Sequence, residues 1–350
     1  MLKKFDHGGD IYSRPVDLDF SININPLGMP AAVRDALMGA VENFDVYPDP
    51  QCRQLTARLS RFLDVPPQWL LFGNGAADLV IRLCLSSRPK RALVCAPTFS
   101  EYEKSALMAG AAVEKFCLRE EDNFHVTPRI FDALERAPDI FFLCNPNNPT
   151  GCMTPPRLIE EIADFCEKKR ITFVIDQCFM GFTPGTSALP LLNGRAHTVI
   201  LDAFTKMYSV AGLRLGFIIS SSQELIRQVS HFGQSWNVST PAQVAGMAAL
   251  DCGTSWIDRT RAFVAEEASY LRSRLRALGL RVFDGAANYV FFKSVVPLTE
   301  ALLRRKILIR SCANYTGLDD RFYRVGIKNR EKDDRLLSAI EKVLHEEEKQ

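Results

Sequence analysis

The chain has 350 residues, of which 47% are apolar and 24% are charged. This composition is typical of globular proteins and excludes extended disorder and collagen-like structure. Its 43 basic and 41 acidic residues give a formal net charge of +2, so we do not expect nucleic acid as a partner, since binding phosphates usually takes a marked basic excess. The length predicts about two domains.

The chain shows no sign of a membrane segment or of secretion. No apolar run approaches the roughly 18 residues that a membrane helix needs, and the first residues turn polar at once, unlike a signal peptide. The ten cysteines form no C-x-x-C pair, and several lie inside apolar runs. This pattern indicates reduced thiols in a cytoplasmic protein without membrane contact, rather than a disulfide framework or a metal site.

The spacing of apolar residues predicts the elements in chain order. The first is one amphipathic helix over residues 30–44. Short apolar runs then alternate with helical stretches, and strands are expected at residues 92–95, 113–118, 140–144, 171–176, 198–202 and 215–220. This alternation predicts an α/β fold with a mostly parallel central sheet.

The C-terminal third has a different pattern. A long helix is expected over residues 256–278, then strand-like alternation at 288–293, 307–310 and 322–327, and a terminal helix from about residue 331. We therefore predict a large α/β domain at residues 45–235. A smaller α+β domain would combine residues 1–44, which form an N-terminal arm, with residues 236–350.

Two polar residues stand where buried strands of this sheet end. Lys206 follows the strand at 198–202, and Asp176 ends the strand at 171–176. Such sheets bind ligands at the carboxyl ends of their strands, although position alone also allows a surface lysine and a capping aspartate. Together the two residues suggest pyridoxal 5'-phosphate, which needs a lysine for its aldehyde and an acid for its ring nitrogen.

Three further segments are expected at the same edge. Asn148 lies in the rigid turn N-P-N-N-P-T-G and would aim its amide at the cofactor, although the turn is also readable as a plain loop. The small residues from Gly75 onward open a helix that would bind phosphate, or would simply start a structural helix. Arg214, eight residues after Lys206, would bind the same phosphate.

Taken in order, these motifs resemble the fold-type I pyridoxal-phosphate enzymes of the class I/II aminotransferase group. The resemblance rests on N-P-N-N-P-T-G, on the strand-end Asp176 and on T-K-x-x-x-x-A-G-L-R-L-G, and it extends over nearly the whole chain. It implies a homodimer with a shared active site. Lys206 would bind the cofactor covalently, and the other cofactor-binding residues would be Gly75, Ala76, Ala77, Phe99, Asn148, Asp176, Thr205, Arg214 and, from the second subunit, Tyr47.

The flanking motifs resemble one branch of this group, the threonine-phosphate decarboxylases of cobalamin biosynthesis. They are H-G-G-D at residues 7–10, D-F-S-I-N-I-N-P-L-G at 19–28 and I-L-I-R-S-C-A-N-Y-T-G-L at 307–318. The resemblance implies decarboxylation of L-threonine O-3-phosphate to (R)-1-amino-2-propanol O-2-phosphate and CO2, and it leaves activity on L-serine O-phosphate open. The residues that would bind this phosphorylated amino acid are His7, Asn23, Asn148, Arg310 and Arg324.

Alternatives to this assignment stay open. Histidinol-phosphate aminotransferases share the central motifs but usually carry tyrosine where this chain has Phe179, and a non-catalytic pyridoxal-phosphate-binding protein is the alternative of another class. The chain also departs from the group at Ala203, where serine is common, at Gln177-Cys178, where Glu-Ala is usual, and in a shortened segment at residues 11–18. Apart from the resemblance, the flanking residues could be a disordered terminus (His7), solvated strand arginines (Arg310 and Arg324) and a core edge residue (Tyr47).

Overall fold

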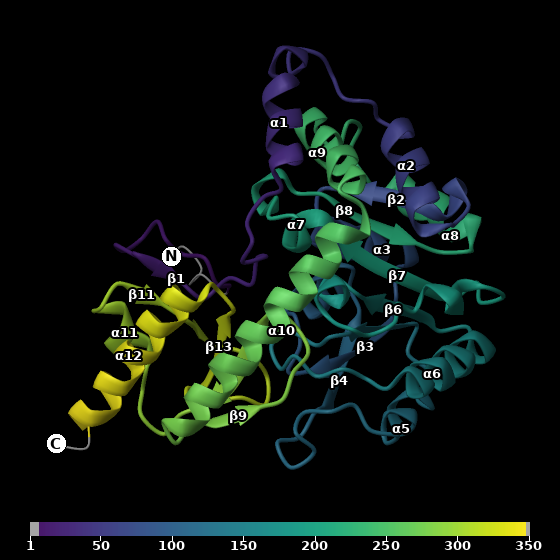
Figure 1. The fold of residues 1–350 in the computed structure, drawn as a ribbon. Coiled ribbons are helices and arrows are strands. Elements are labelled where there is room, and N and C mark those ends of the chain that lie inside the picture. Colours follow the sequence, from purple (N-terminus) through teal and green to yellow (C-terminus); the bar gives the residue numbers. More distant parts are fainter. Residues whose placement is uncertain (1–6, 348–350) are drawn as a thin grey trace.

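A seven-stranded sheet forms the centre of the larger part of the molecule (Figure 1). The structure is a computed structural model that describes residues 7–347. The strand order is β2-β8-β7-β6-β5-β3-β4. The five strands from β7 to β4 are parallel, and β8 is antiparallel to both of its neighbours. The strands are β2 (Leu70–Gly73), β3 (Arg91–Ala96), β4 (Ala112–Cys117), β5 (Ile140–Cys144), β6 (Thr172–Asp176), β7 (Thr198–Ala203) and β8 (Gly216–Ile219).

Helices bury both faces of this sheet, which explains why its inner strands are apolar throughout. One face packs against α3 (Ala76–Ser87), α4 (Glu101–Met108) and α8 (Gln223–His231). The other packs against α5 (Ile130–Leu134) and α6 (Pro156–Lys169). In β5 every residue of the run I-F-F-L-C is buried, and a basic last turn complements the dipole of α6.

The C-terminal third forms a smaller sheet, of order β12-β13-β10-β9, and all of its neighbouring strands are antiparallel. Its strands are β9 (Arg281–Phe283), β10 (Tyr289–Lys293), β12 (Arg310–Ser311) and β13 (Phe322–Gly326). The long helix α10 (Gly253–Ala277) packs beside β9, β10 and the terminal helix α12 (Arg330–Glu347), and α11 (Thr299–Leu303) also lies against α12 (Figure 1).

Four further helices lie in the described part of the chain. They are α1 (Ala31–Gly39), α2 (Arg53–Leu63), α7 (Phe204–Met207) and α9 (Thr240–Asp251), with 3-10 turns at Val41–Asn43, Pro67–Trp69, Met180–Phe182, Leu189–Leu192 and Ala211–Leu213. Helix α9 packs against α1 and α2, so residues beyond 236 contact N-terminal helices (Figure 1). The predicted domain limits remain a prediction. No helix among residues 7–347 has the length and apolar character needed to cross a bilayer.

The N-terminal arm connects the two sheets and ends beside Lys206. Its strand β1 (Leu18–Asp19) pairs in parallel with β11 (Ile307–Leu308). Farther along, the Gly326 N–H donates to the Phe20 carbonyl at 2.7 Å. A Cβ at Gly326 would lie 2.2 Å from the Ile22 carbonyl oxygen, so only glycine permits this approach. The arm then reaches the Lys206 carbonyl, which accepts from the Asn25 N–H at 3.1 Å.

Most of the predicted elements are confirmed, with three corrections. The expected single helix at 30–44 is wrong, because α1 ends at Gly39 and a separate 3-10 turn follows at Val41–Asn43. Strand β2 was not predicted, and its antiparallel pairing with β8 adds a non-parallel edge to the sheet. The run at 307–310 divides into β11, which pairs with the arm, and β12, which pairs with β13.

Candidate active site

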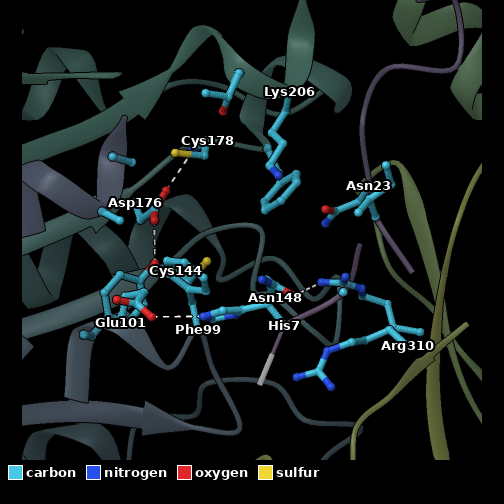
Figure 2. Close-up of a pocket in the computed structure, with 18 of the residues that line it drawn as sticks. His7, Asn23, Phe99, Glu101, Cys144, Asn148, Asp176, Cys178, Lys206 and Arg310 are labelled. Carbon is cyan, nitrogen blue, oxygen red and sulfur yellow. Dashed lines mark hydrogen bonds and ion pairs between the residues drawn. The ribbon is translucent and has the colours of Figure 1, made fainter. Parts of the chain in front are cut away.

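A cavity of about 350 Å³ lies between the carboxyl ends of the central strands, the smaller sheet and the N-terminal arm. All the candidate site residues except Gly75 and Tyr47 line this cavity. Figure 2 shows Asp176 and Cys178 on one side and Asn23 and Arg310 on the other, with Lys206 reaching in between them. Segments from both ends of the chain therefore meet at the end of the parallel sheet, where ligands bind in such folds.

Lys206 lies in the short helix α7, directly after β7. Burial, together with the positive charges of Arg324 and Arg214, lowers the pKa of its amine to about 8. A substantial fraction of the amine is therefore neutral near physiological pH, as a nucleophilic lysine requires. The structure places Lys206 in a partly buried crevice and not on the open surface.

Asp176 is the last residue of β6, and its side chain is buried. Burial raises the pKa of this carboxyl. Two donors counteract the effect: the Tyr102 hydroxyl reaches Oδ2 at 2.5 Å, and the Cys178 N–H reaches Oδ1 at 2.9 Å. A buried carboxylate held by two hydrogen bonds is suited to pair with a cationic ring nitrogen.

Arg324 fixes the orientation of Asn148. One terminal nitrogen of the guanidinium, Nη1, donates to Asn148 Oδ1, and the other, Nη2, donates to the Ser21 carbonyl at 2.6 Å. The guanidinium also lies 5.4 Å from the centre of the Tyr289 ring, within cation–π range. Because the Asn148 oxygen is already an acceptor, its NH2 group is the part of the amide left to donate to a ligand.

The start of α3 and Arg214 form a cradle for a phosphate. Gly75 precedes this helix with a φ of +81°, and a Cβ added there would lie 2.5 Å from Arg214 Nη2. Only glycine therefore allows the guanidinium to lie against the helix start. Ala76, Ala77 and Thr205 line the cavity at the same place. Unpaired backbone N–H groups and a guanidinium together are suited to bind a phosphate dianion.

Two buried donors in the cavity wall have no acceptor among the described residues. They are Asn23 Nδ2 and Arg324 Nε. Leaving buried donors without partners is costly, so both fit a site that receives an anionic ligand. With the amine, the buried carboxylate and the phosphate cradle, the residues fit pyridoxal 5'-phosphate and leave further donors for a substrate.

Arg310 lines the side of the cavity away from Asp176, whereas His7 lines it beside Glu101 (Figure 2). Arg310 donates to the Ser311 carbonyl at 2.6 Å and to Asn314 Oδ1 at 2.7 Å, and its guanidinium lies 5.1 Å from the centre of the Tyr315 ring. His7 lies 3.0 Å from Glu101 Oε1 through Nε2, and its ring centre is 5.9 Å from that of Phe99. The His7 side chain nevertheless remains 42% exposed.

Tyr47 lies away from the cavity. Its side chain is 77% exposed and stacks on Trp236, with ring centres 4.3 Å apart. Its expected contribution to the site of a second subunit stays a prediction, because the structure contains a single chain.

Sequence reasoning missed several residues that line the cavity or hold its groups. Glu101 and Tyr102 start α4, two and three residues after the candidate Phe99, and both are buried. The sequence signal that could have indicated these two residues is an acidic residue followed by a tyrosine at the start of a helix beside the sheet edge. Ser21 lies within the motif D-F-S-I-N-I-N-P-L-G, and its carbonyl accepts from Arg324. Cys144, Cys178, Phe179 and Tyr315 also line the cavity.

The fold and this set of residues define a pyridoxal-phosphate enzyme of fold type I. The model of the family aminotransferase class I and II matches residues 15–340, and the chain belongs to that family.

Relatives with known names resemble the chain over most of its length. The threonine-phosphate decarboxylase of Salmonella typhimurium is 37% identical over 332 residues, which cover 93% of this chain and 91% of that protein. The adenosylcobalamin biosynthesis bifunctional protein of Leptospira interrogans is 28% identical over 362 residues, covering 97% of this chain and 41% of that protein. The solved histidinol-phosphate aminotransferase from Clostridium acetobutylicum superimposes with a TM-score of 0.87 at 29% identity, covering 93% of this chain and 98% of that one.

Proposed function

We propose that the protein is a pyridoxal-phosphate-dependent decarboxylase that converts L-threonine O-3-phosphate to (R)-1-amino-2-propanol O-2-phosphate and CO2 in cobalamin biosynthesis. The observation that carries the proposal is the set of anion-binding groups that remains once the cofactor's own partners are assigned. Arg324, Arg310 and His7 line the same cavity as Lys206. A carboxylate and a phosphate on one amino acid would occupy such a set, and the similarity to the Salmonella typhimurium decarboxylase supports this choice.

In this proposal each group has a defined task. When bound, the cofactor supplies a protonated ring that accepts the electron pair released at the substrate Cα. Asp176 keeps the ring nitrogen protonated, and Asn148 donates its amide to the phenolate oxygen. Arg324 binds the substrate carboxylate, while His7, Asn23 and Arg310 bind the phosphate. Holding the substrate at both ends decides which Cα bond is aligned for cleavage.

Lys206 has a second task after CO2 leaves. Its amine lies in the cavity and its pKa of about 8 lets it exchange protons near neutral pH. It would therefore deliver the proton that replaces the lost carboxylate on Cα. A transaminase would use the same amine to remove a proton from Cα, so the lysine alone does not separate the two reactions.

Histidinol-phosphate aminotransferase activity is the alternative, and the fold similarity to the Clostridium acetobutylicum enzyme favours it. Phe179 weighs against it, because such aminotransferases usually carry a tyrosine there. In this chain Phe179 is buried and packs edge-on against Tyr289, with ring centres 5.2 Å apart. A phenylalanine cannot donate a hydrogen bond to the cofactor.

One assay separates these activities. The purified holoenzyme is incubated with L-threonine O-3-phosphate, L-serine O-phosphate or histidinol phosphate, each with and without 2-oxoglutarate, and CO2 and glutamate are measured. We expect CO2 release from L-threonine O-3-phosphate without added 2-oxoglutarate. L-serine O-phosphate differs by one methyl group, which corresponds to roughly a 10- to 200-fold discrimination. Glutamate formation without CO2 would replace the decarboxylase with an aminotransferase, and a bound cofactor without either product would favour a non-catalytic protein.

We also propose a homodimer in which Tyr47 completes the site of the partner. Support comes from exposed apolar side chains that we call the dimer patch: those of Met38, Val41, Phe44, Val46 and Tyr47, and that of Trp236, on which Tyr47 stacks. Large apolar surfaces of this kind commonly mark protein contacts. We further propose a cytoplasmic location, which the free thiols of all ten cysteines support.

Replacing Val41 with aspartate in the dimer patch is expected to weaken the dimer, because Val41 is 53% exposed in the single chain and a buried unpaired charge is costly. Sedimentation velocity should show a dimer for the wild type and a larger monomer fraction for Val41→Asp. Tyr47→Phe should leave the dimer intact and weaken cofactor binding severalfold through loss of one hydrogen bond. A monomeric wild type, or a Tyr47→Phe variant with unchanged cofactor affinity, would contradict the proposal.

A further inference from the structure

We propose that Glu101 is a positioning residue that holds His7 at the phosphate-binding end of the cavity. The inference rests on the proposed function and deepens it, because it names the group that places one of the substrate's phosphate ligands. Glu101 belongs to the large sheet's layer of helices, whereas His7 belongs to the N-terminal arm. Their contact therefore joins two segments that are distant in the sequence at one edge of the cavity, and Figure 2 marks it with a dashed line.

Glu101 is held in place independently of His7. It lies in the first turn of α4, its side chain lines the cavity, and the residue is only 7% exposed. Lys104, one turn farther along the helix, approaches its two carboxylate oxygens at 3.3 and 3.4 Å. A carboxylate fixed by its own helix provides a rigid partner for a side chain from a distant segment.

The carboxylate also determines which ring atom of His7 carries hydrogen. His7 is the largest influence that lowers the pKa of Glu101, and Lys104 adds to it against the effect of burial. An ionised carboxylate only accepts hydrogen bonds. His7 Nε2, 3.0 Å from Glu101 Oε1, is therefore the donor of this bond. The other nitrogen, Nδ1, faces no such partner among the described residues, and in the imidazolium form, in which both ring nitrogens carry hydrogen, it can donate to a phosphate oxygen.

The backbone beside His7 is anchored separately, at Ser21. The Gly9 N–H donates to Ser21 Oγ at 2.7 Å, and Ser21 Oγ donates to Asp19 Oδ1 at 2.6 Å. A Cβ at Gly8 would lie 2.3 Å from the Ser21 carbonyl oxygen, which is the oxygen that accepts from Arg324. We call residues 7–9 the strap. Ser21 fixes its backbone, and Glu101 fixes the imidazole.

This arrangement explains how His7 can contribute a defined contact. A histidine side chain that rotated freely would lose that freedom on binding a ligand unless it were already held. Because Glu101 and Phe99 already contact the imidazole ring, the entropy lost in ordering this ring is not lost again when the substrate binds. Removal of Glu101 should therefore weaken substrate binding. Asn23 and Arg310 would still hold the phosphate, so the alignment of the Cα bond and with it the bond-breaking step should be unaffected.

The test compares Glu101→Ala, Glu101→Gln, His7→Ala and the double variant Glu101→Ala/His7→Ala as holoenzymes. We measure kcat and KM for L-threonine O-3-phosphate, cofactor occupancy from absorbance, and the dissociation constant of L-threonine O-3-phosphate from the change in that absorbance. Glu101→Ala should raise KM and the dissociation constant about tenfold, which is typical of a lost charge-assisted hydrogen bond. The value of kcat and cofactor occupancy should stay within twofold of wild type. Glu101→Gln, which keeps an acceptor, should recover part of the loss.

The double variant distinguishes positioning from a direct or purely structural role. If Glu101 acts through His7, the double variant should bind no worse than His7→Ala, because both changes remove the same contact. Additive losses, or an unchanged KM in Glu101→Ala, would overturn the inference. The matched control is Glu103→Gln, because Glu103 lies in the same helix and pairs with Lys115 at 2.8 Å outside the cavity.

A backbone variant tests the strap without touching either side chain. Gly8→Ala would place a methyl group against the Ser21 carbonyl, so the strap must move and His7 with it. We expect the same rise in KM at unchanged kcat. An unaltered KM in Gly8→Ala would show that the strap does not hold the phosphate ligand.

These readouts keep the two proposals separable. A wild type that binds L-threonine O-3-phosphate without releasing CO2, while Glu101→Ala binds it more weakly, would end the proposed function and keep the role of Glu101. Normal turnover by the wild type, together with an unchanged KM in Glu101→Ala, would keep the proposed function and end the role of Glu101. A wild type that neither binds nor converts this compound would overturn both.

Discussion

Replacing Lys206 with alanine should lower kcat by a factor of about 10⁴ or more, since the change removes both the covalent anchor and the proton carrier. Lys206→Arg should be equally inactive, because a guanidinium stays protonated and cannot act as the nucleophile. Both variants should still fold and bind the cofactor weakly through Arg214 and the start of α3. Turnover of L-threonine O-3-phosphate and the thermal midpoint of unfolding check the two expectations.

Chemical labelling tests the same residue in the unaltered protein. Borohydride reduction of the holoenzyme, followed by peptide mass mapping, should place the cofactor on Lys206. Capture of pyridoxal 5'-phosphate by the apoprotein should accelerate as the pH rises through about 8, because the amine with the lowered pKa is then deprotonated. The control is Lys169→Ala, since Lys169 forms a surface pair with Glu135 at 2.8 Å. A label on another lysine would refute the assignment of the site.

Asp176→Asn should lower kcat by roughly 10²–10³ at full cofactor occupancy, the range seen when one preorganised electrostatic group is lost. Asparagine keeps the size of the side chain and its oxygen, but it cannot balance the positive charge of a protonated ring. Tyr102→Phe should give a smaller loss, because it removes only the hydroxyl that donates to Asp176 Oδ2 at 2.5 Å. The measurement is turnover corrected for bound cofactor.

The control variant for Asp176→Asn is Asp164→Asn. Asp164 is an exposed residue of α6 that pairs with Arg195 at 2.7 Å, and its replacement should leave turnover unchanged. If Asp176→Asn retained more than a tenth of wild-type kcat, the carboxylate would not be the partner of the ring nitrogen. That result would also remove the physical reason for burying Asp176 at the end of β6.

The apolar runs of the central sheet were sufficient to predict its inner strands, because strands buried on both faces carry a continuous apolar signal. β2 escaped prediction, since it is a four-residue edge strand between a 3-10 turn and a glycine-rich loop. The break after α1 also escaped, because Val41 and Phe44 keep the helical spacing although both side chains are exposed. The spacing of apolar residues shows that one helix face would be apolar. It does not show whether another part of the fold covers that face.

Some residues of the candidate site were likewise predictable from the sequence, and others were not. Lys206 and Asp176 were predictable, because strand ends of a parallel sheet meet at one edge. Glu101 was not, since its partner His7 is 94 residues away and only the folded chain brings the two together. Neither was the contact by which Arg324 orients Asn148, across 176 residues. The role of Tyr47 depends on a second chain, so a single sequence or structure leaves it as an expectation.

The pairing of β1 with β11 has a consequence for how the protein is made. Leu18 leaves the ribosome early, but its partner Ile307 is synthesised almost 290 residues later. At roughly 5–20 residues per second, this delay is about 15–60 s. During that time the arm has no partner strand, and Phe20, which the finished fold buries completely, has no place to pack. The wall of the cavity that contains Asn23 and Arg324 is therefore the last part to assemble, long after the strand that leads to Lys206 has been synthesised.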